Sequence, residues 1–175
     1  QTCALPISEI GKAELSTGAI ISSPYIGNMI SSQQGVSWNI DQTKDLTDTD
    51  KENVECLAWN LYFEARGGTT NEQISVAYVP INRTHAPHWS NNICENVFQY
   101  NYVNGRKAYQ FIWAGFNISP RWPVEHETWK KVQFIAYQVY RGEVADPSNG
   151  ALYFNHHSVG GGRGSIRIGS HLFFK

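Results

Sequence analysis

The chain has 175 residues, of which 41% are hydrophobic and 13% aromatic, and this much apolar material for one packed core excludes a disordered or fibrous protein. Its formal net charge is −1 without long blocks of Lys and Arg, which excludes duplex nucleic acid as the main partner because phosphate binding depends on clustered cations. No stretch reaches the roughly 18 to 20 apolar residues that a membrane-spanning helix requires.

Residues 1–45 differ in composition from the rest of the chain. They are rich in Ser, Gly, Ile and Gln, low in charge, and without a sustained helical or strand period. We expect an arm or extension over 1–45 that packs on the domain or on an assembly partner, and an organised domain over 46–175. No signal peptide is visible and the first residue is not Met, so we expect a processed, truncated or engineered start.

The organised part is expected to open with a helix. The stretch 47–50 supplies N-cap residues and early acids, and apolar residues then recur at helical spacing up to Ala65. The pair Gly67-Gly68 ends this helix. Glu64 falls on the last turn, about 90° from the centre of the apolar face, where it borders the core and opens towards the glycine bend.

A second helix is expected directly after the glycines. The stretch 70–73, Thr-Asn-Glu-Gln, has the form of a capping box before an apolar run that continues to Val79. Pro80 is expected to kink or interrupt this helix, because it removes a backbone donor and crowds the preceding turn. Residues 85–122 are interpreted as a loop region rich in aromatic side chains.

The last third of the chain predicts one more helix and a small sheet. The helix starts near Pro123 and ends at Gly142, and a strong turn signal follows it at 146–150. Short strands are expected at 151–154, 166–168 and 171–174, with a Gly-rich loop between the first two. Helices first and strands last make an α+β domain that is mainly helical, with a small antiparallel sheet near the C-terminus.

Three cysteines do not form a dense disulfide framework. Cys56 and Cys94 could pair and leave Cys3 free, but their spacing alone does not decide this. Buried free thiols are the alternative.

The position of Glu64 suits an acid catalyst. Partial burial among Tyr62, Phe63 and neighbouring aromatic residues would disfavour the ionised carboxylate and raise its pKa. Cleavage of a glycosidic bond needs such a protonated carboxyl group, which gives its proton to the leaving oxygen. The alternative from the residues alone is an ordinary helix-end glutamate that pairs with Arg66 or Lys107.

The segment 56–67, Cys-Leu-Ala-Trp-Asn-Leu-Tyr-Phe-Glu-Ala-Arg-Gly, resembles the signature of the SleB/CwlJ-type cell wall hydrolases, which include spore cortex-lytic enzymes and phage endolysins. The likeness continues in chain order to the C-terminus and covers about residues 52 to 175. Its further motifs are Gln73-Ile74-Ser75-Val76-Ala77, Asn82-Arg83, Ile93-Cys94-Glu95-Asn96-Val97, Gln110-Phe111-Ile112-Trp113, 146–156 and 167–173. Pro80 and Ala114-Gly115-Phe116 depart from the family pattern, which affects the expected shape of the cleft more than the chemistry.

This resemblance implies a fold related to lysozymes and lytic transglycosylases, which cut peptidoglycan between N-acetylmuramic acid and N-acetylglucosamine. The family's catalytic glutamate aligns with Glu64. The expected place of action is the bacterial cell wall, for a phage lysin, a virion component or an exported bacterial enzyme, and the arm at 1–45 would suit a virion or spore assembly partner. In the family pattern Cys56 and Cys94 flank the helix that carries Glu64, so we expect them to lie close enough to pair.

The mechanism depends on a second carboxylate. A retaining glycosidase needs one roughly 5 to 5.5 Å from the acid, and an inverting enzyme one roughly 6.5 to 9.5 Å away. Glu72, Glu95 and Asp146 are the candidates, yet none lies in a segment that obviously faces Glu64. A lytic transglycosylase needs no such partner, because the C6 hydroxyl of the substrate attacks the anomeric carbon. The resemblance favours this route over a hydrolytic muramidase.

Four residues are candidates for sugar contacts, although core packing would explain each equally well. Gln110 can donate to and accept from an acetamido group, and Trp113 can stack on a sugar face. Tyr153 and His156 are the other two.

Two further classes of function stay open at this point. His156, His157 and His171 on neighbouring strands would suit a zinc amidase that cuts the peptide stem. Because no His-Glu-x-x-His or comparable spacing supports a metal site, we expect neither a metal nor a cofactor. A catalytically dead wall-binding or virion module is the last alternative, and retention of Glu64 inside its full motif argues against it.

Overall fold

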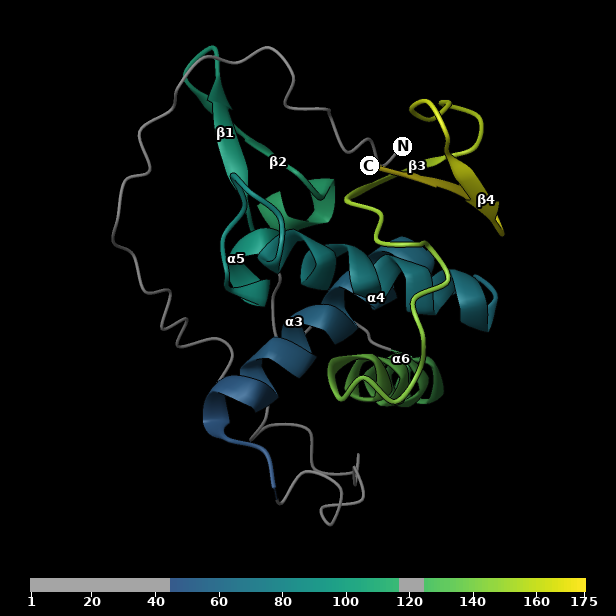
Figure 1. Ribbon diagram of the computed structural model, residues 1–175. Coiled ribbons are helices and arrows are strands. Elements are labelled where there is room, and N and C mark those ends of the chain that lie inside the picture. Colours follow the sequence, from purple (N-terminus) through teal and green to yellow (C-terminus); the bar gives the residue numbers. More distant parts are fainter. Residues whose placement is uncertain (1–44, 117–124) are drawn as a thin grey trace.

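Three helices pack against one another and carry two small antiparallel sheets on one side (Figure 1). This computed structural model describes residues 45–116 and 125–175. Almost all of the expected arm at 1–45, together with Trp122 and Pro123, lies outside the described residues. The helices are α3 (Asp48–Ala65), α4 (Thr70–Thr84) and α6 (His126–Tyr140), with the short α5 (Ile93–Val97) beside α3 and α4.

Helix α3 forms where the sequence predicts it. The Thr47 side chain accepts a hydrogen bond from the Asp50 backbone N–H, and the Asp50 carboxylate accepts one from the Thr47 N–H at 2.9 Å. These reciprocal bonds satisfy two of the backbone donors that every helix start leaves without partners. The helix ends at Ala65, just before the Gly67-Gly68 bend. Its apolar face is buried against α4 and α6 and forms the centre of the core.

Helix α4 begins one residue earlier than the sequence pattern indicates. Thr69 is the N-cap and Glu72 the third helical residue, and the two make a reciprocal capping box. The expectation of a box over 70–73 is therefore wrong by one position. As a consequence, the Gln73 side chain is not used to cap its own helix.

Pro80 does not interrupt α4, which runs on without a break to Thr84. An interior proline costs about 3 kcal/mol of helix stability. Here Pro80 is buried together with Val76 and Val79 before it, and the Pro80 carbonyl accepts a hydrogen bond from the Asn96 side chain. Packing thus outweighs the local preference, and the predicted interruption is wrong.

Within the region expected to be a loop, residues 85–116 contain regular structure. Strands β1 (Tyr100–Val103) and β2 (Arg106–Tyr109) form a hairpin, and a 3-10 helix, η1 (Ile112–Gly115), follows. Asn104 and Gly105 form the two-residue turn of the hairpin, with φ values of 51° and 74°. Asn-Gly between two strands is the strongest short-range signal for such a turn, since both positions need a positive φ. The loop interpretation overlooked this signal.

The C-terminal sheet has the order β3-β5-β4, and both of its pairings are antiparallel. Strands β4 (Ile166–Ile168) and β5 (His171–Phe174) match the expected ranges, whereas β3 (Tyr153–His156) starts two residues later than expected. Figure 1 shows this sheet and the β1–β2 hairpin on the side of the helices opposite α6. The α+β fold class, mainly helical with small antiparallel sheets, is confirmed.

Cys56 and Cys94 form a disulfide, with their Cα atoms 5.4 Å apart. The bond joins the middle of α3 to α5, which precedes the β1–β2 hairpin. The predicted proximity is confirmed, and the alternative of buried free thiols is wrong for this pair.

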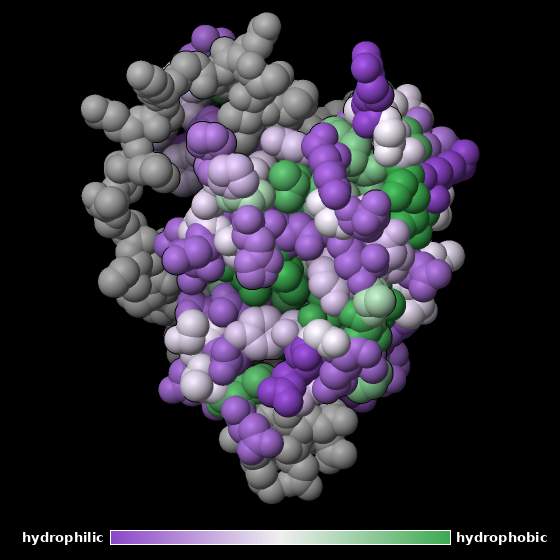
Figure 2. Space-filling model, viewed as in Figure 1, coloured by the Kyte–Doolittle hydropathy of each residue, from purple (hydrophilic) through white to green (hydrophobic). Residues whose placement is uncertain are grey.

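Within the described part of the chain, no helix combines the length and the apolar character that crossing a membrane would need. Figure 2 shows hydrophilic residues over much of one face, with apolar residues in small groups between them.

Candidate active site

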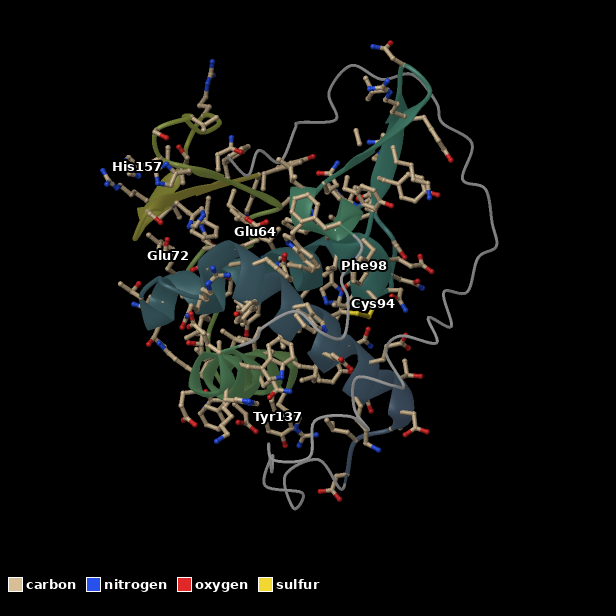
Figure 3. All side chains as sticks on the ribbon, turned by 180° about the vertical axis from the view of Figure 1, so that it is seen from behind. Glu64, Glu72, Cys94, Phe98, Tyr137 and His157 are labelled. Carbon is tan, nitrogen blue, oxygen red and sulfur yellow. A yellow bond between two sulfur atoms is a disulfide. The ribbon has the colours of Figure 1, made fainter. Side chains whose placement is uncertain are left out.

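Glu64 lies on the last turn of α3, at the side of the helices that carries both sheets. Figure 3 shows it between the β3–β5 sheet and the region of the hairpin. The residue is half-buried, and water reaches neither of its two carboxylate oxygens. The expected position at the border of the core is therefore confirmed.

A stack of three aromatic rings fixes the residue before Glu64. Phe63 lies between Trp59, 5.8 Å away between ring centroids, and Trp113, 4.9 Å away, and both pairs are close to parallel. Trp59 in turn packs on Trp129 of α6 at 4.4 Å. Aromatic pairs of this kind stabilise by about 0.5 to 1.5 kcal/mol each beyond the area they bury. The stack therefore limits the motion of the turn that carries Glu64.

Gln73 holds the same turn from α4. Its side chain is fully buried, and its Nε2 donates to the carbonyl oxygens of Ala65 at 3.0 Å and Arg66 at 3.2 Å. The last carbonyls of a helix have no partner within the helix, so a buried amide donor stabilises the end of α3. Sequence reasoning missed this role, because the pattern assigned Gln73 to the cap of its own helix.

Glu72 joins the start of α4 to the turn before β5. Its carboxylate accepts hydrogen bonds from the Ser170 N–H at 2.9 Å, from the Ser170 hydroxyl, from His171 Nδ1 at 2.6 Å and from the Thr69 N–H. We call Glu72, Thr69, Ser170 and His171 the Glu72 cluster. Gly169 lies against Glu72 with a φ of +60°, and a Cβ there would fall 2.1 Å from the Glu72 carboxylate oxygen. Only glycine fits this approach.

The electrostatics of the Glu72 cluster follow from its burial. Burial opposes ionisation of Glu72, but the hydrogen bonds from Ser170 and His171 outweigh this effect and lower its pKa. Burial also lowers the pKa of His171, against the opposite pull of the Glu72 carboxylate. An ionised Glu72 next to a neutral His171 that donates from Nδ1 agrees with both directions. The arrangement supports the fold rather than a proton transfer.

The other two candidate carboxylates also hold local structure. Asp146 accepts from the backbone N–H groups of Ser148 and Gly150 and from the Asn82 side chain, and so fixes the turn before β3. Glu95 lies on the exposed start of α5 and accepts from the Ser90 hydroxyl. Glu72, Glu95 and Asp146 thus each accept hydrogen bonds that hold a turn or a helix start.

Arg83 is a further buried charge, and it joins α4 to β3. Its Nε donates to the Leu152 carbonyl at 2.8 Å, and its guanidinium lies 4.0 Å from the centre of the Trp89 ring. Burial lowers its pKa to about 9. Arg83 contacts aromatic rings and a backbone carbonyl. These contacts hold the start of β3 against α4.

Two predicted sugar-binding residues, Gln110 and Trp113, lie on the hairpin side of Glu64. Both are buried, and Trp113 uses one ring face for Phe63. Gln110 Oε1 and Trp113 Nε1 have no hydrogen-bond partner among the described residues. Buried polar atoms without protein partners are uncommon and indicate a place for water or a ligand. Their sugar contacts stay a prediction.

The other two, Tyr153 and His156, leave β3 on opposite faces, since side chains alternate along a strand. Tyr153 stacks on Phe174, with ring centroids 5.5 Å apart. His156 lies 4.4 Å from His157 and 6.2 Å from His171, again between ring centroids. The three histidines are neighbours, as expected. Over 45–116 and 125–175, however, no group of His, Cys, Asp and Glu side chains is arranged to hold a metal ion.

Comparison with known proteins places the chain in a family. The Cell Wall Hydrolase family matches residues 67–174, a range that begins three residues after Glu64. The crystal structure of the catalytic domain of the Bacillus cereus SleB protein is similar to this chain, with 22% identity and a TM-score of 0.49, over 71% of this chain and 91% of that domain. No curated protein gives a significant match. Because the family match spans more than half of the chain, from the bend after Glu64 to β5, the protein belongs to the cell wall hydrolases and is a peptidoglycan-degrading enzyme.

Proposed function

We propose that this enzyme cuts the glycan strand of peptidoglycan between N-acetylmuramic acid and N-acetylglucosamine, with Glu64 as general acid and then general base and residues 46–175 as the catalytic domain. The observation that carries the proposal is the position of Glu64, on a helix end held by the Phe63 stack and by Gln73, with both carboxylate oxygens shielded from water. A shielded and firmly held carboxyl group is the environment that proton donation to a leaving oxygen needs.

The proposed reaction proceeds by lytic transglycosylation. Glu64 gives its proton to the glycosidic oxygen as the bond from that oxygen to the anomeric carbon breaks. The C6 hydroxyl of the same muramic acid then attacks the anomeric carbon, and its proton returns to Glu64. The products are a free N-acetylglucosamine hydroxyl and a 1,6-anhydro-N-acetylmuramic acid end, and no water is consumed.

The surroundings of the other carboxylates support this route over hydrolysis. A hydrolytic muramidase places a second carboxylate near the acid, either as the nucleophile or as the base for a water. The three candidates, Glu72, Glu95 and Asp146, each accept hydrogen bonds that hold a turn or a helix start. The stretch 117–124 contains no acidic residue. A mechanism with a single carboxylate needs none of these groups.

The Cys56–Cys94 disulfide supports action outside a reducing cytoplasm, since disulfides persist in oxidising surroundings. Both expected origins, a phage lysin or virion component and an exported bacterial enzyme, act in such surroundings.

Mass analysis of peptidoglycan digested by the purified protein tests the proposed route. Transglycosylation gives fragments with 1,6-anhydro ends, which are lighter by one water than the reducing ends that a muramidase produces. We expect anhydro ends to predominate. Predominantly reducing ends would contradict the transglycosylase route, and release of peptide stems from intact glycan would favour the zinc amidase instead.

A further inference from the structure

The β1–β2 hairpin carries three tyrosines and a lysine on one face. Its register pairs Tyr100 with Tyr109 and Tyr102 with Lys107, so these four side chains leave the hairpin on the same side. We call this set the tyrosine face. The Tyr100 ring lies 5.7 Å from Tyr102 and 5.3 Å from Tyr109, and Lys107 Nζ lies 4.0 Å from its centre.

The tyrosine face is exposed without serving the core. Tyr102 is 64% exposed and Tyr100 37%. Tyr102 and Tyr109 each contact the Tyr100 ring. A ring that is fixed by such contacts offers flat apolar area and loses little rotamer entropy when a ligand binds. Figure 1 shows the hairpin extending away from the helices.

The tyrosine face continues towards Glu64 through η1. The Tyr109 ring packs so closely on Gly115 that a Cβ there would come within 2.8 Å of the ring. Trp113, two residues earlier in the same 3-10 helix, stacks on Phe63 at 4.9 Å, directly before Glu64. Exposed Ile112 and Phe116 extend the apolar surface along this segment. A polymer bound on the tyrosine face would therefore run along the segment that borders the proposed acid.

The charge of the hairpin region favours a polymer that carries a few negative charges. Between Phe98 and Phe116 the sequence carries Arg106 and Lys107 and no acidic residue, although the whole chain has a net charge of −1. Sugar rings present apolar C–H faces that stack on tyrosine, and the muramic acid substituents of a peptidoglycan strand carry carboxylates. Lys107 lies on the tyrosine face and complements such a strand, whereas Arg106 pairs with Val103 and leaves the hairpin on the other face. These two cations are too few for the repeated phosphate contacts of nucleic acid binding.

We propose that the tyrosine face binds the glycan strand of peptidoglycan beyond the residues that react. This inference rests on the proposed function, because it assigns the approach of the same polymer to the same site. Sugar rings stack on Tyr100 and Tyr102, and Lys107 on the same face lies near the acidic substituents of the strand. The surface raises the affinity for long strands and leaves the chemical step on a short fragment unchanged.

Sedimentation with purified sacculi tests the proposal in the Glu64→Gln background, which keeps the polymer intact. Exchange of Tyr100 and Tyr102 together for Ala is expected to weaken binding roughly tenfold, because it removes two rings that stack on sugar faces. Phe134→Ala on α6 is the matched control, since Phe134 is 46% exposed and α6 lies on the opposite side of the helices. We expect this control to bind as the parent does.

Two further arms separate the possible outcomes. Glycan strands stripped of peptide stems keep a free lactyl carboxylate on each muramic acid, so both the tyrosine variant and Lys107→Ala should still lose binding on them, and added salt should reduce only the loss caused by Lys107→Ala. Binding of the tyrosine variant at the parental level, an equal loss in Phe134→Ala, or a preference for a single-stranded oligonucleotide would each overturn the proposal. Soluble glycan fragments in the supernatant would show instead that Glu64 is not the acid. This outcome would contradict the proposed function, and it is measured independently of the amount of protein bound to the sacculi.

Discussion

At the scale of single residues, the surroundings of Glu64 are built from side chains that are distant in the sequence. Phe63 is held by Trp113, and the carbonyls at the end of α3 are held by Gln73. The position of Glu64 could be predicted, because helical spacing places it on the last turn. These partners could not, since spacing gives no information about which buried side chain from another element reaches a helix end.

Gln73→Leu tests the role of this amide. The change keeps approximate size but removes both hydrogen bonds from Gln73 Nε2, so the Ala65 carbonyl keeps only the Gly68 N–H as donor and the Arg66 carbonyl loses the Gln73 amide. We expect the free energy of unfolding to fall by about 1 to 3 kcal/mol and kcat to fall while KM stays near its original value, because Glu64 is displaced but the glycan surface is not. Gln133→Leu, at a half-buried position on α6, is the control. A rise in KM with unchanged kcat would contradict the positioning role.

At the scale of elements, the helices were predicted more accurately than the segments between them. Capping residues and the apolar period locate α3, and the strands β4 and β5 fall where expected. The hairpin was missed although its Asn104-Gly105 signal is local. The wrong expectation of an interruption at Pro80 has a different cause, since the buried packing of Pro80, Val76 and Val79 outweighs the local preference. The contact between Glu72 and His171 joins residues 99 positions apart, which no local pattern can indicate.

Helix α3 also carries a second shielded carboxyl group, Glu55, whose pKa is raised to about 7 by burial despite a hydrogen bond from Trp59. In the unfolded chain its pKa is near 4.5. The folded state therefore holds this proton more tightly, and its contribution to stability is complete below pH 4.5 and is lost as the pH rises through 7.

Replacement of Glu55 by Gln removes this titration and keeps a hydrogen-bond acceptor for Trp59. Relative to the parent, the variant should gain stability as the pH rises, reaching roughly 1 to 3 kcal/mol at pH 8 and little at pH 4.5. Denaturant unfolding at both pH values measures the difference. Glu127→Gln, in an exposed pair with Lys130, should show no such trend. A difference that is independent of pH would contradict the assignment.

At the scale of the whole molecule, the helices form a base from which the hairpin and the C-terminal sheet extend on one side, with Glu64 between them (Figures 1 and 3). The disulfide ties α3 to the segment leading into the hairpin, and the Glu72 cluster ties α4 to the sheet. The hairpin is thereby attached to the middle of α3, and the C-terminal sheet to the start of α4, just after the bend that follows Glu64. In the proposed function, this arrangement holds Glu64 next to the surface that binds the glycan strand.

Digestion of purified peptidoglycan by the parent protein and by Glu64→Gln tests the central claim most directly. Gln keeps the size of the side chain and removes only the transferable proton, so folding and wall binding should stay intact. Glu55→Gln is the matched control, because it lies nine residues earlier on the same helix and hence on its opposite side. We expect glycan fragments from the parent and from Glu55→Gln, and none from Glu64→Gln. Activity of Glu64→Gln within about tenfold of the parent would contradict the account, since loss of a general acid costs on the order of 10²-fold or more.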